Sequence, residues 1–291
     1  MRKVARYLGL IFLSILTACK SQVKQHFSES HQIDFNEVLW YAQRASLAYS
    51  DEKTIKKALP NATRVVELKD AVQYFLEIDS ANNRQIISVR GTSNLKNAKE
   101  DAQHIPIKDK LLNNYIHRGF DEASIQVYND VKPFLNKDYT TVCTGHSLGA
   151  AISTLLMARL ELDGFKIGKS INFGQPKLTN KEGAVKYSHL SLLRVVDNKD
   201  LVPLCPPATI LNSLHGTYHH FGRELILFKD NYYSFLEESD AENNITSEFW
   251  LSFGEKSLED HYMENYIKNI KNKIESGGIE TEYKSRKRHE K

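Results

Sequence analysis

The sequence predicts a single α/β domain with a mostly parallel central sheet flanked by helices. In the middle of the chain, apolar β-branched segments alternate with helical ones, which is typical of a parallel sheet covered on both faces. The chain has 291 residues, of which 41% are hydrophobic and 26% charged, enough to bury one large core. No internal repeat or linker divides it. We therefore assign residues 33–275 to one domain and residues 276–291 to a charged, solvated tail.

The first 32 residues look like an export segment followed by a tether. A basic start precedes an apolar run at residues 7–16, which is too short to span a bilayer. The run ends in Leu16-Thr17-Ala18-Cys19, which resembles a bacterial lipobox. We interpret residues 1–18 as a lipoprotein signal peptide, Cys19 as the acylated residue and residues 19–32 as lipidated N-terminus and tether. The alternatives are a retained anchor helix and ordinary cleavage near Ala18.

The charge distribution bears on partners and location. Arg2, Lys3 and Arg6 account for the whole net charge of +3, so a chain cleaved after Ala18 would be neutral. Such a chain lacks the positive field that attracts phosphates, and we expect no nucleic-acid partner. The expected location is the bacterial cell envelope, with a lipid anchor at the N-terminus. Lys20 after the acylated residue favours the outer over the inner membrane.

The N-terminal half of the predicted domain contains one helix and two strands. Residues 34–49 form the helix, with Asp34 as N-cap, Glu37 completing a capping box, and small apolar residues on one face. Residues 72–78 and 85–89 are apolar and β-branched, which predicts strands joined by a turn at residues 80–83.

The C-terminal half alternates between strands and helices. Predicted strands are residues 140–144, 169–173, 189–196 and 224–228. Predicted helices are residues 120–135, 148–162 and 258–270. Pro133 is expected to end or bend the first of these helices, because proline removes a helical hydrogen bond.

The strongest chemical feature is Gly145-His146-Ser147-Leu148-Gly149, between a predicted strand and a predicted helix. This Gly-x-Ser-x-Gly pattern is weak alone, but its strand–turn–helix context makes Ser147 a candidate nucleophile. Side chains flanking the sharp turn would collide, and Gly145 and Gly149 remove them. The helix N-terminus also directs backbone N–H groups at a developing oxyanion. We expect His146 to point away from the substrate and to pack.

Seven segments together resemble one known family. They are residues 88–92 (SVRGT), 117–120 (HRGF), 144–151 (TGHSLGAA), 172–176 (NFGQP), 194–203 (RVVDNKDLVP), 220–224 (HFGRE) and 260–266 (DHYMENY). Their order and spacing resemble the class 3 lipases, the fungal-lipase-like branch of the α/β-hydrolases, from residue 34 to about residue 266. The resemblance implies an α/β-hydrolase fold and hydrolysis of lipid or small esters by a Ser-Asp-His triad without a cofactor.

The family pattern selects the acid of this triad. The carboxylate stands immediately before an apolar-apolar-Pro run, and Asp200-Leu201-Val202-Pro203 fits. Asp197 follows the same predicted strand and is a structural neighbour or a substitute. The acid has to remain ionised to orient the imidazole and stabilise the imidazolium.

The base should follow the acid in the chain. The candidates are His215, His219, His220, His261 and His289. His289 lies in the charged tail, and the family keeps a structural histidine at the His219-His220 position. We favour His261, placed at the start of the last predicted helix, with Tyr262 and Tyr266 anchoring that start by packing.

The resemblance also places the oxyanion hole and a lid. Thr92 follows Gly91 and would donate its backbone N–H, and Leu148 would supply the second N–H. Residues 93–108 occupy the lid position but are mostly polar, which argues against strong interfacial activation. The aromatic residues at 249–253 have two interpretations, a lining of the substrate groove or packing in the core, and the sequence does not decide between them.

Metal and cysteine chemistry are not expected at the site. No H-E-x-x-H pattern or paired Cys/His spacing is present, so we predict neither a metal nor another cofactor. Cys143 lies on the strand before the turn and should be buried and inert. Cys205 follows the candidate acid, and a disulfide between the two cysteines stays open.

The leading hypothesis is a membrane-anchored serine hydrolase acting on lipid esters through an acyl-enzyme. Triglyceride, phospholipid and small-ester substrates are not distinguished. One alternative is a non-catalytic, envelope-tethered binding module derived from a hydrolase, against which the complete triad argues. Another is an acyltransferase, in which an alcohol instead of water resolves the acyl-enzyme.

Overall fold

The computed structural model describes residues 33–92, 106–197, 200–206, 217–237 and 259–283. The chain separates into residues 1–33 and a compact unit from Asp34 to Lys291, which holds the described fold. The predicted signal peptide, Cys19 and the tether lie outside the described residues, as do most of the lid region and the aromatic segment 249–253. Among the described helices, none is long and apolar enough to cross a membrane.

A ten-stranded sheet forms the centre of this unit, in the order β1-β2-β3-β6-β8-β9-β10-β11-β12, with β7 paired to β6. The strands are β1 (Ala62–Glu67), β2 (Gln73–Asp79), β3 (Arg84–Val89), β6 (Thr140–His146), β7 (Lys166–Ile167), β8 (Ser170–Phe173), β9 (Leu192–Asp197), β10 (Arg223–Leu227), β11 (Tyr232–Leu236) and β12 (Ile279–Glu280). Pairing is parallel from β3 to β10, and antiparallel in β1–β2–β3 and in β10–β11. A separate two-stranded sheet pairs β4 (Pro106–Lys108) with β5 (Tyr115–His117).

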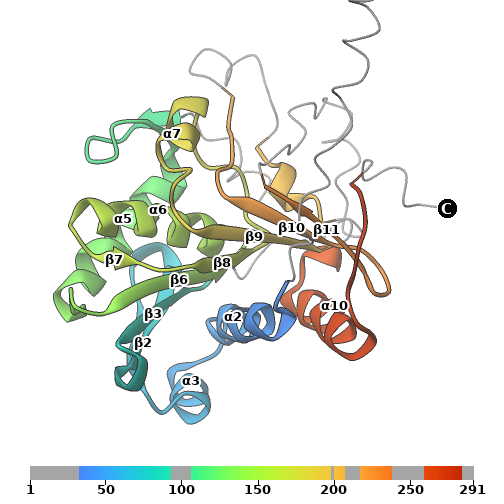
Figure 1. Cartoon of the computed structure of the whole chain (residues 1–291). Helices are drawn as coiled ribbons and strands as arrows, with labels where there is room; N and C mark the ends of the chain where they lie inside the picture. Colours follow the sequence, from blue (N-terminus) through green and yellow to red (C-terminus); the bar gives the residue numbers. More distant parts are fainter. Residues whose placement is uncertain (1–32, 93–105, 198–199, 207–216, 238–258, 284–291) are drawn as a thin grey trace, which may run out of the picture. The chain divides into compact units, whose positions relative to one another are not determined.

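Helices cover both faces of the sheet, as Figure 1 shows. One face carries α5 (Arg118–Val131) and α6 (Leu148–Leu162); α6 packs on β6, and α5 packs on α6. The other carries α2 (Phe35–Leu47) and α10 (Met263–Ser276), which pack together while α2 also contacts β6 and β8. The remaining helices are α3 (Glu52–Ala58), α7 (Lys181–Lys186) and the short 3-10 turns η1 (Lys69–Ala71), η2 (Ser80–Asn82), η4 (Lys132–Phe134) and η5 (Val202–Leu204). This arrangement confirms the predicted α/β-hydrolase fold class.

Capping and ion pairing fix α2 against the sheet. Asp34 is its N-cap and accepts hydrogen bonds from the N–H groups of Asn36 and Glu37, as predicted. The Glu37 carboxylate pairs with Lys169 across the fold, so the capping box is not formed. In place of the box, a long-range ion pair holds the first turn of the helix.

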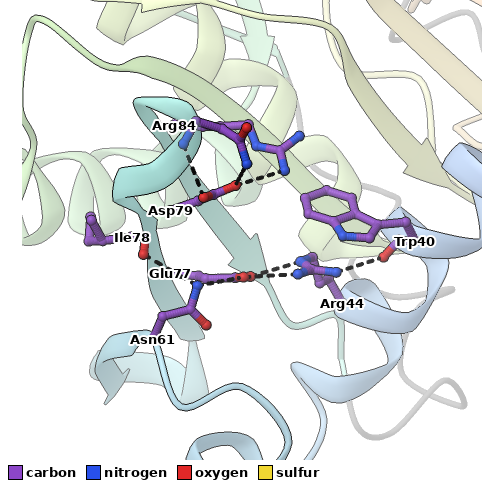
Figure 2. A network of polar contacts seen from close by, with 8 residues as sticks. Trp40, Arg44, Asn61, Glu77, Ile78, Asp79 and Arg84 are labelled. Atoms are coloured by element: carbon purple, nitrogen blue, oxygen red, sulfur yellow. Dashed lines mark hydrogen bonds and ion pairs between the residues drawn. The ribbon is translucent and has the colours of Figure 1, made fainter.

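A polar network holds the last turn of α2 to strand β2 (Figure 2). Arg44 of α2 makes two hydrogen bonds to Glu77 of β2, at 2.8 and 2.9 Å, and its guanidinium lies 3.5 Å from the ring centre of Trp40. Asn61 donates to the same carboxylate at 3.1 Å. Because both charges are buried and paired bidentately, the network fixes the position from which the chain leaves α2.

The structure differs from the predicted elements mainly at their ends. The strand predicted at 189–196 begins only at Leu192, because residues before it form a turn in which Leu190 N–H donates to Tyr187 O. The helix predicted to reach residue 135 ends at Val131 and continues as η4 around Pro133. The last helix starts at Met263, five residues later than predicted, because residues 259–261 form a 3-10 turn, and it continues to Ser276.

Several elements were not predicted. α3 and β1 lie between the first predicted helix and the strand predicted from residue 72, where no element was expected. The segment assigned to the solvated tail also contributes to the sheet, since Ile279 and Glu280 form β12 and pair with β11. These pairings join segments far apart in the chain, which local patterns do not encode.

Candidate active site

Ser147 occupies a sharp turn between β6 and α6. Its backbone has φ 58° and ψ −128°, an uncommon conformation for a residue with a side chain. The Ser147 N–H donates to the carbonyl oxygen of Phe173 on β8 at 2.9 Å, which fixes the turn to the neighbouring strand. The residue is 4% exposed. A strained, well-anchored serine at a strand–helix junction is the geometry of a nucleophile elbow.

The flanking glycines are required by close backbone contacts. A Cβ on Gly145 would lie 2.4 Å from the backbone of Gly149. A Cβ on Gly149 would lie 2.3 Å from the carbonyl oxygen of Val89 on β3. Both distances are too short for a side chain, so the turn depends on glycine at the two positions singled out from the sequence.

The two candidate oxyanion-hole residues lie on either side of this turn. Thr92 is half-buried, and the preceding Gly91 lies against the elbow, since a Cβ there would be 3.1 Å from Ser147 Cβ. Leu148 is the first residue of α6, and N–H groups in a first helical turn have no intrahelical acceptor. The positive end of α6 thus faces the same region as the loop of Thr92.

Asp200 and His261 form a completely buried pair. Their Oδ2 and Nδ1 atoms lie 2.8 Å apart, and both side chains are 0% exposed. Val202 N–H donates to Asp200 Oδ1 at 2.9 Å, and the Tyr266 hydroxyl donates to Oδ2. Burial raises the pKa of Asp200, but the charge of His261 and these hydrogen bonds outweigh it, and the net pKa is lowered. Asp200 is therefore ionised at neutral pH.

His261 stands beside the elbow, in the turn that precedes α10. Its ring centre lies 4.5 Å from that of His146, the residue before Ser147. Gly174 allows this approach, because a Cβ at that glycine would lie 2.8 Å from His261 Cε1 and 2.9 Å from Asp200 Oδ2. The second ring nitrogen, Nε2, is buried and makes no hydrogen bond within the described residues. That nitrogen is available to a substrate or a nucleophile.

The competing acid has a different environment. Asp197 ends β9 and accepts a hydrogen bond from Asn269 Nδ2 at 2.6 Å. Burial, opposed by this hydrogen bond, raises the pKa of Asp197 to about 7. The structure thus pairs Asp200, and not Asp197, with a histidine.

The competing histidines have structural contacts or lie outside the described residues. His220 Nε2 is 2.7 Å from the carbonyl oxygen of Pro203, and His219 Nε2 is 2.9 Å from the hydroxyl of Thr217. His215 and His289 lie outside the described residues.

His146 is buried, as predicted, and both ring nitrogens are engaged. Nε2 lies 2.7 Å from the carbonyl oxygen of His261, and Nδ1 lies 2.8 Å from the Tyr49 hydroxyl. No sequence pattern indicated this role of Tyr49, which lies 97 residues before His146 in the chain. The expected anchoring by Tyr262 is wrong, because that residue is 49% exposed. Tyr266 is buried, and it contacts the acid by a hydrogen bond that packing alone did not predict.

The cysteines take no part in this arrangement. Cys143 and Cys205 are buried and unpaired, so no disulfide joins them. Burial raises the pKa of both thiols, that of Cys205 to about 12. Within the described ranges, no group of three or more His, Cys, Asp or Glu side chains is arranged to hold a metal ion.

A serine elbow beside a buried Asp–His pair, at the end of a central parallel strand, defines an α/β-hydrolase fold with a serine-type site. Residues 86–210 match the family model described as Lipase (class 3).

The chain is also similar to known lipases, in sequence over part of its length and in fold. The chain is 30% identical over 152 residues to secreted mono- and diacylglycerol lipase 1 of Fusarium solani, a match covering 49% of this chain and 45% of that protein. Its fold is similar to that of the Lip2 lipase of Yarrowia lipolytica, with a TM-score of 0.61 and 20% identity, covering 76% of this chain and 92% of the other. A triacylglycerol lipase described as having a serine protease triad gives a TM-score of 0.60 at 20% identity, covering 80% and 94%. The chain spans less than half the length of the curated relatives it matches.

Proposed function

We propose that this protein hydrolyses carboxylic esters of lipids, with Ser147 as nucleophile, His261 as general base and Asp200 as the acid that orients it. The observation that carries the proposal is the buried hydrogen bond between Asp200 and His261, placed beside a serine elbow. The ionised Asp200 fixes the proton of His261 on Nδ1 and leaves Nε2 as the acceptor.

The reaction follows from this geometry. Ser147 Oγ attacks the ester carbonyl carbon and transfers its proton to His261 Nε2. The carbonyl oxygen becomes an oxyanion, which the backbone N–H groups of Thr92 and Leu148 stabilise. The C–O bond to the alcohol breaks as the imidazolium protonates the leaving oxygen. Water then gives a proton to His261 and attacks the acyl carbon. The imidazolium returns this proton to Ser147 Oγ as the acyl-enzyme bond breaks, which releases the carboxylic acid and the free serine.

The substrate class rests on the relatives. Their names include mono- and diacylglycerol lipase and phospholipase A1, which share ester bonds between fatty acids and a glycerol backbone. We propose acylglycerols or glycerophospholipids for this chain. Transfer of the acyl group to an alcohol uses the same site and differs only in the acceptor. Comparison of free acid with ester formed in added glycerol separates hydrolase from acyltransferase.

The test uses the full-length chain in a mild detergent. The wild type is treated with a fluorophosphonate probe and a series of p-nitrophenyl esters with different acyl lengths. We expect labelling and turnover in the wild type and the loss of both in Ser147→Ala. A folded wild type that neither labels nor turns over, in detergent and with mixed lipid micelles, would exclude the enzyme and favour a binding module.

A matched pair of variants tests the choice of acid. Asp200→Asn removes the carboxylate that faces His261, so we expect kcat to fall about 10⁴-fold, as for the acid of other serine triads. Asp197→Asn changes a carboxylate that contacts Asn269 and should leave kcat within about threefold of the wild type. Equal losses in the two variants would contradict the assignment of Asp200.

We also propose that the protein is held in a bacterial envelope by acylation of Cys19. The support is the order of basic residues, apolar run and Leu16-Thr17-Ala18-Cys19. An alkyne-tagged fatty acid fed to a bacterial host should label the wild type in the membrane fraction but not Cys19→Ala. Equal labelling of both proteins would contradict this proposal.

A further inference from the structure

The active-site segments are joined by a chain of hydrogen bonds that the reaction itself does not use. The Tyr49 hydroxyl lies 2.8 Å from His146 Nδ1, and His146 Nε2 lies 2.7 Å from the carbonyl oxygen of His261. At the other end, the Tyr49 hydroxyl lies against Gly91, since a Cβ on that glycine would be 2.3 Å from the hydroxyl oxygen. These contacts therefore connect the loop of Thr92, through the residue before Ser147, to the backbone of the proposed base.

We propose that Tyr49 and His146 are positioning residues that set the distances between the oxyanion-hole loop, the nucleophile and the base. This inference rests on the function proposed above. Thr92 follows Gly91 directly, Ser147 follows His146 directly, and His261 accepts at its own carbonyl oxygen. Each proposed reacting group is thus at most one residue away from an atom that takes part in these contacts.

The direction of each hydrogen bond follows from the acceptor at one end. A carbonyl oxygen can only accept, so His146 Nε2 carries the ring proton. In a neutral ring Nδ1 is then the acceptor, and the Tyr49 hydroxyl donates to it. In this arrangement each donor has an acceptor, so the hydrogen bonds have one fixed direction and restrain the residues that they join.

His146 has to remain neutral for this arrangement. Burial and the neighbouring His261 lower the pKa of His146 to about 3. A second positive charge, 4.5 Å from the ring centre of His261, would oppose formation of the imidazolium during the reaction. The ring is therefore suited to carry a fixed hydrogen-bond pattern and unsuited to exchange protons itself.

Close contacts leave the oxyanion loop little room to move. A Cβ on Gly91 would lie 2.3 Å from the Tyr49 hydroxyl oxygen and 2.5 Å from the carbonyl oxygen of His146. The tyrosine is itself held in place because it follows α2, whose Arg44 is paired with Glu77. A displacement of about 1 Å between catalytic groups can lower a rate about 100-fold, so this restraint bears on kcat.

The first experiment compares Tyr49→Phe with Tyr41→Phe in the full-length chain, using a p-nitrophenyl ester. Tyr41 is a matched control, because it lies on α2 and its buried hydroxyl donates to the carbonyl oxygen of Lys169 at 2.5 Å, away from Ser147. We expect Tyr49→Phe to lower kcat about tenfold with KM within about twofold, because binding groups are untouched while transition-state geometry is lost. Tyr41→Phe should lower the melting temperature similarly but keep kcat within about twofold.

A second pair of variants tests His146 through its hydrogen bond and not through its volume. His146→Gln can still donate an amide N–H towards the His261 carbonyl oxygen, whereas His146→Leu cannot. We expect kcat of the Gln variant to be at least about fivefold above that of the Leu variant, the worth of one hydrogen bond. Both proteins are checked for folding by circular dichroism, and a pair that folds differently is compared by fluorophosphonate labelling rate per folded molecule.

The outcomes separate this inference from the function on which it rests. An active wild type, with Tyr49→Phe as active as Tyr41→Phe or with equal Gln and Leu variants, would overturn the positioning role alone. A wild type without labelling or turnover would overturn the proposed function first.

Discussion

The Tyr266 hydroxyl donates to Asp200 Oδ2, the same carboxylate oxygen that lies 2.8 Å from His261 Nδ1. Tyr266 is completely buried on α10, and burial together with nearby carboxylates raises its pKa well above the ordinary value, so it remains a donor. With Val202 N–H on Oδ1, both carboxylate oxygens accept hydrogen bonds. α10 thus supplies a tyrosine that holds the proposed acid, next to the turn that supplies the proposed base.

Removal of the Tyr266 hydroxyl should make the orientation of the Asp200 carboxylate less fixed without unfolding the protein. For Tyr266→Phe we expect kcat to fall about fivefold at constant KM, and the free energy of unfolding to fall about 1 kcal/mol. Steady-state kinetics and urea denaturation measure the two effects. Tyr187→Phe, which removes a buried hydroxyl bonded to the carbonyl oxygen of Leu112, should lose stability alone. An unchanged kcat in Tyr266→Phe would show that two donors suffice to orient Asp200.

Gly174 lies where β8 ends, and its missing side chain makes room for the Asp–His pair. Gly174→Ala would place a Cβ 2.8 Å from His261 Cε1 at a positive φ of 55°. We expect kcat to fall at least about 100-fold, because the imidazole has to shift. Gly277→Ala is the matched control, since its φ is 71° but nothing lies within 4 Å of the new Cβ. Both variants should lose about 1 kcal/mol to backbone strain, and similar kcat values in the two would contradict the steric argument.

The sequence predicted the parts of the site that depend on short-range patterns. The elbow was found because strand, turn and helix are continuous in the chain, and glycine is needed at fixed offsets from Ser147. Asp200 and His261 were found through chain order and family motifs, since their contact spans 61 residues. The central strands were found from their apolar runs, which are typical of strands buried on both faces.

What the sequence did not predict depends on tertiary contacts. Tyr49 and Tyr266 become part of the site only when α2 and α10 pack together on one face of the sheet. The tyrosine hydroxyls have no periodicity that separates a hydrogen-bonding role from packing. The β12 strand exists because Ile279 N–H reaches the carbonyl oxygen of Asn231, and a strand of two residues is too short to show a sequence pattern.

Strain at the nucleophile predicts a trade-off between stability and activity. Ser147 holds φ 58° and ψ −128°, a conformation that glycine adopts readily and residues with a Cβ do not. Ser147→Gly should therefore be more stable than Ser147→Ala by about 1 kcal/mol, although glycine raises the entropy of the unfolded chain. Both variants lack the hydroxyl of the proposed nucleophile, so chemical denaturation compares the stability of two proteins that are both expected to be inactive. A less stable Ser147→Gly would indicate that the turn is not strained.

The raised pKa of Asp197 predicts how the free energy of unfolding depends on pH. Its folded-state pKa of about 7 lies above the ordinary value of 3.8, so the folded state binds the proton more tightly than the unfolded state. The free energy of unfolding therefore falls as pH rises from about 4 to about 7, and the full penalty is present above that window. Asp197→Asn removes the ionisation and keeps an oxygen that can accept from Asn269. We expect the stability gain of this variant to be roughly 2–3 kcal/mol larger at pH 8 than at pH 5, measured by urea denaturation at both pH values. A gain that is independent of pH would show that the Asp197 carboxyl is already ionised at pH 5 in the folded protein.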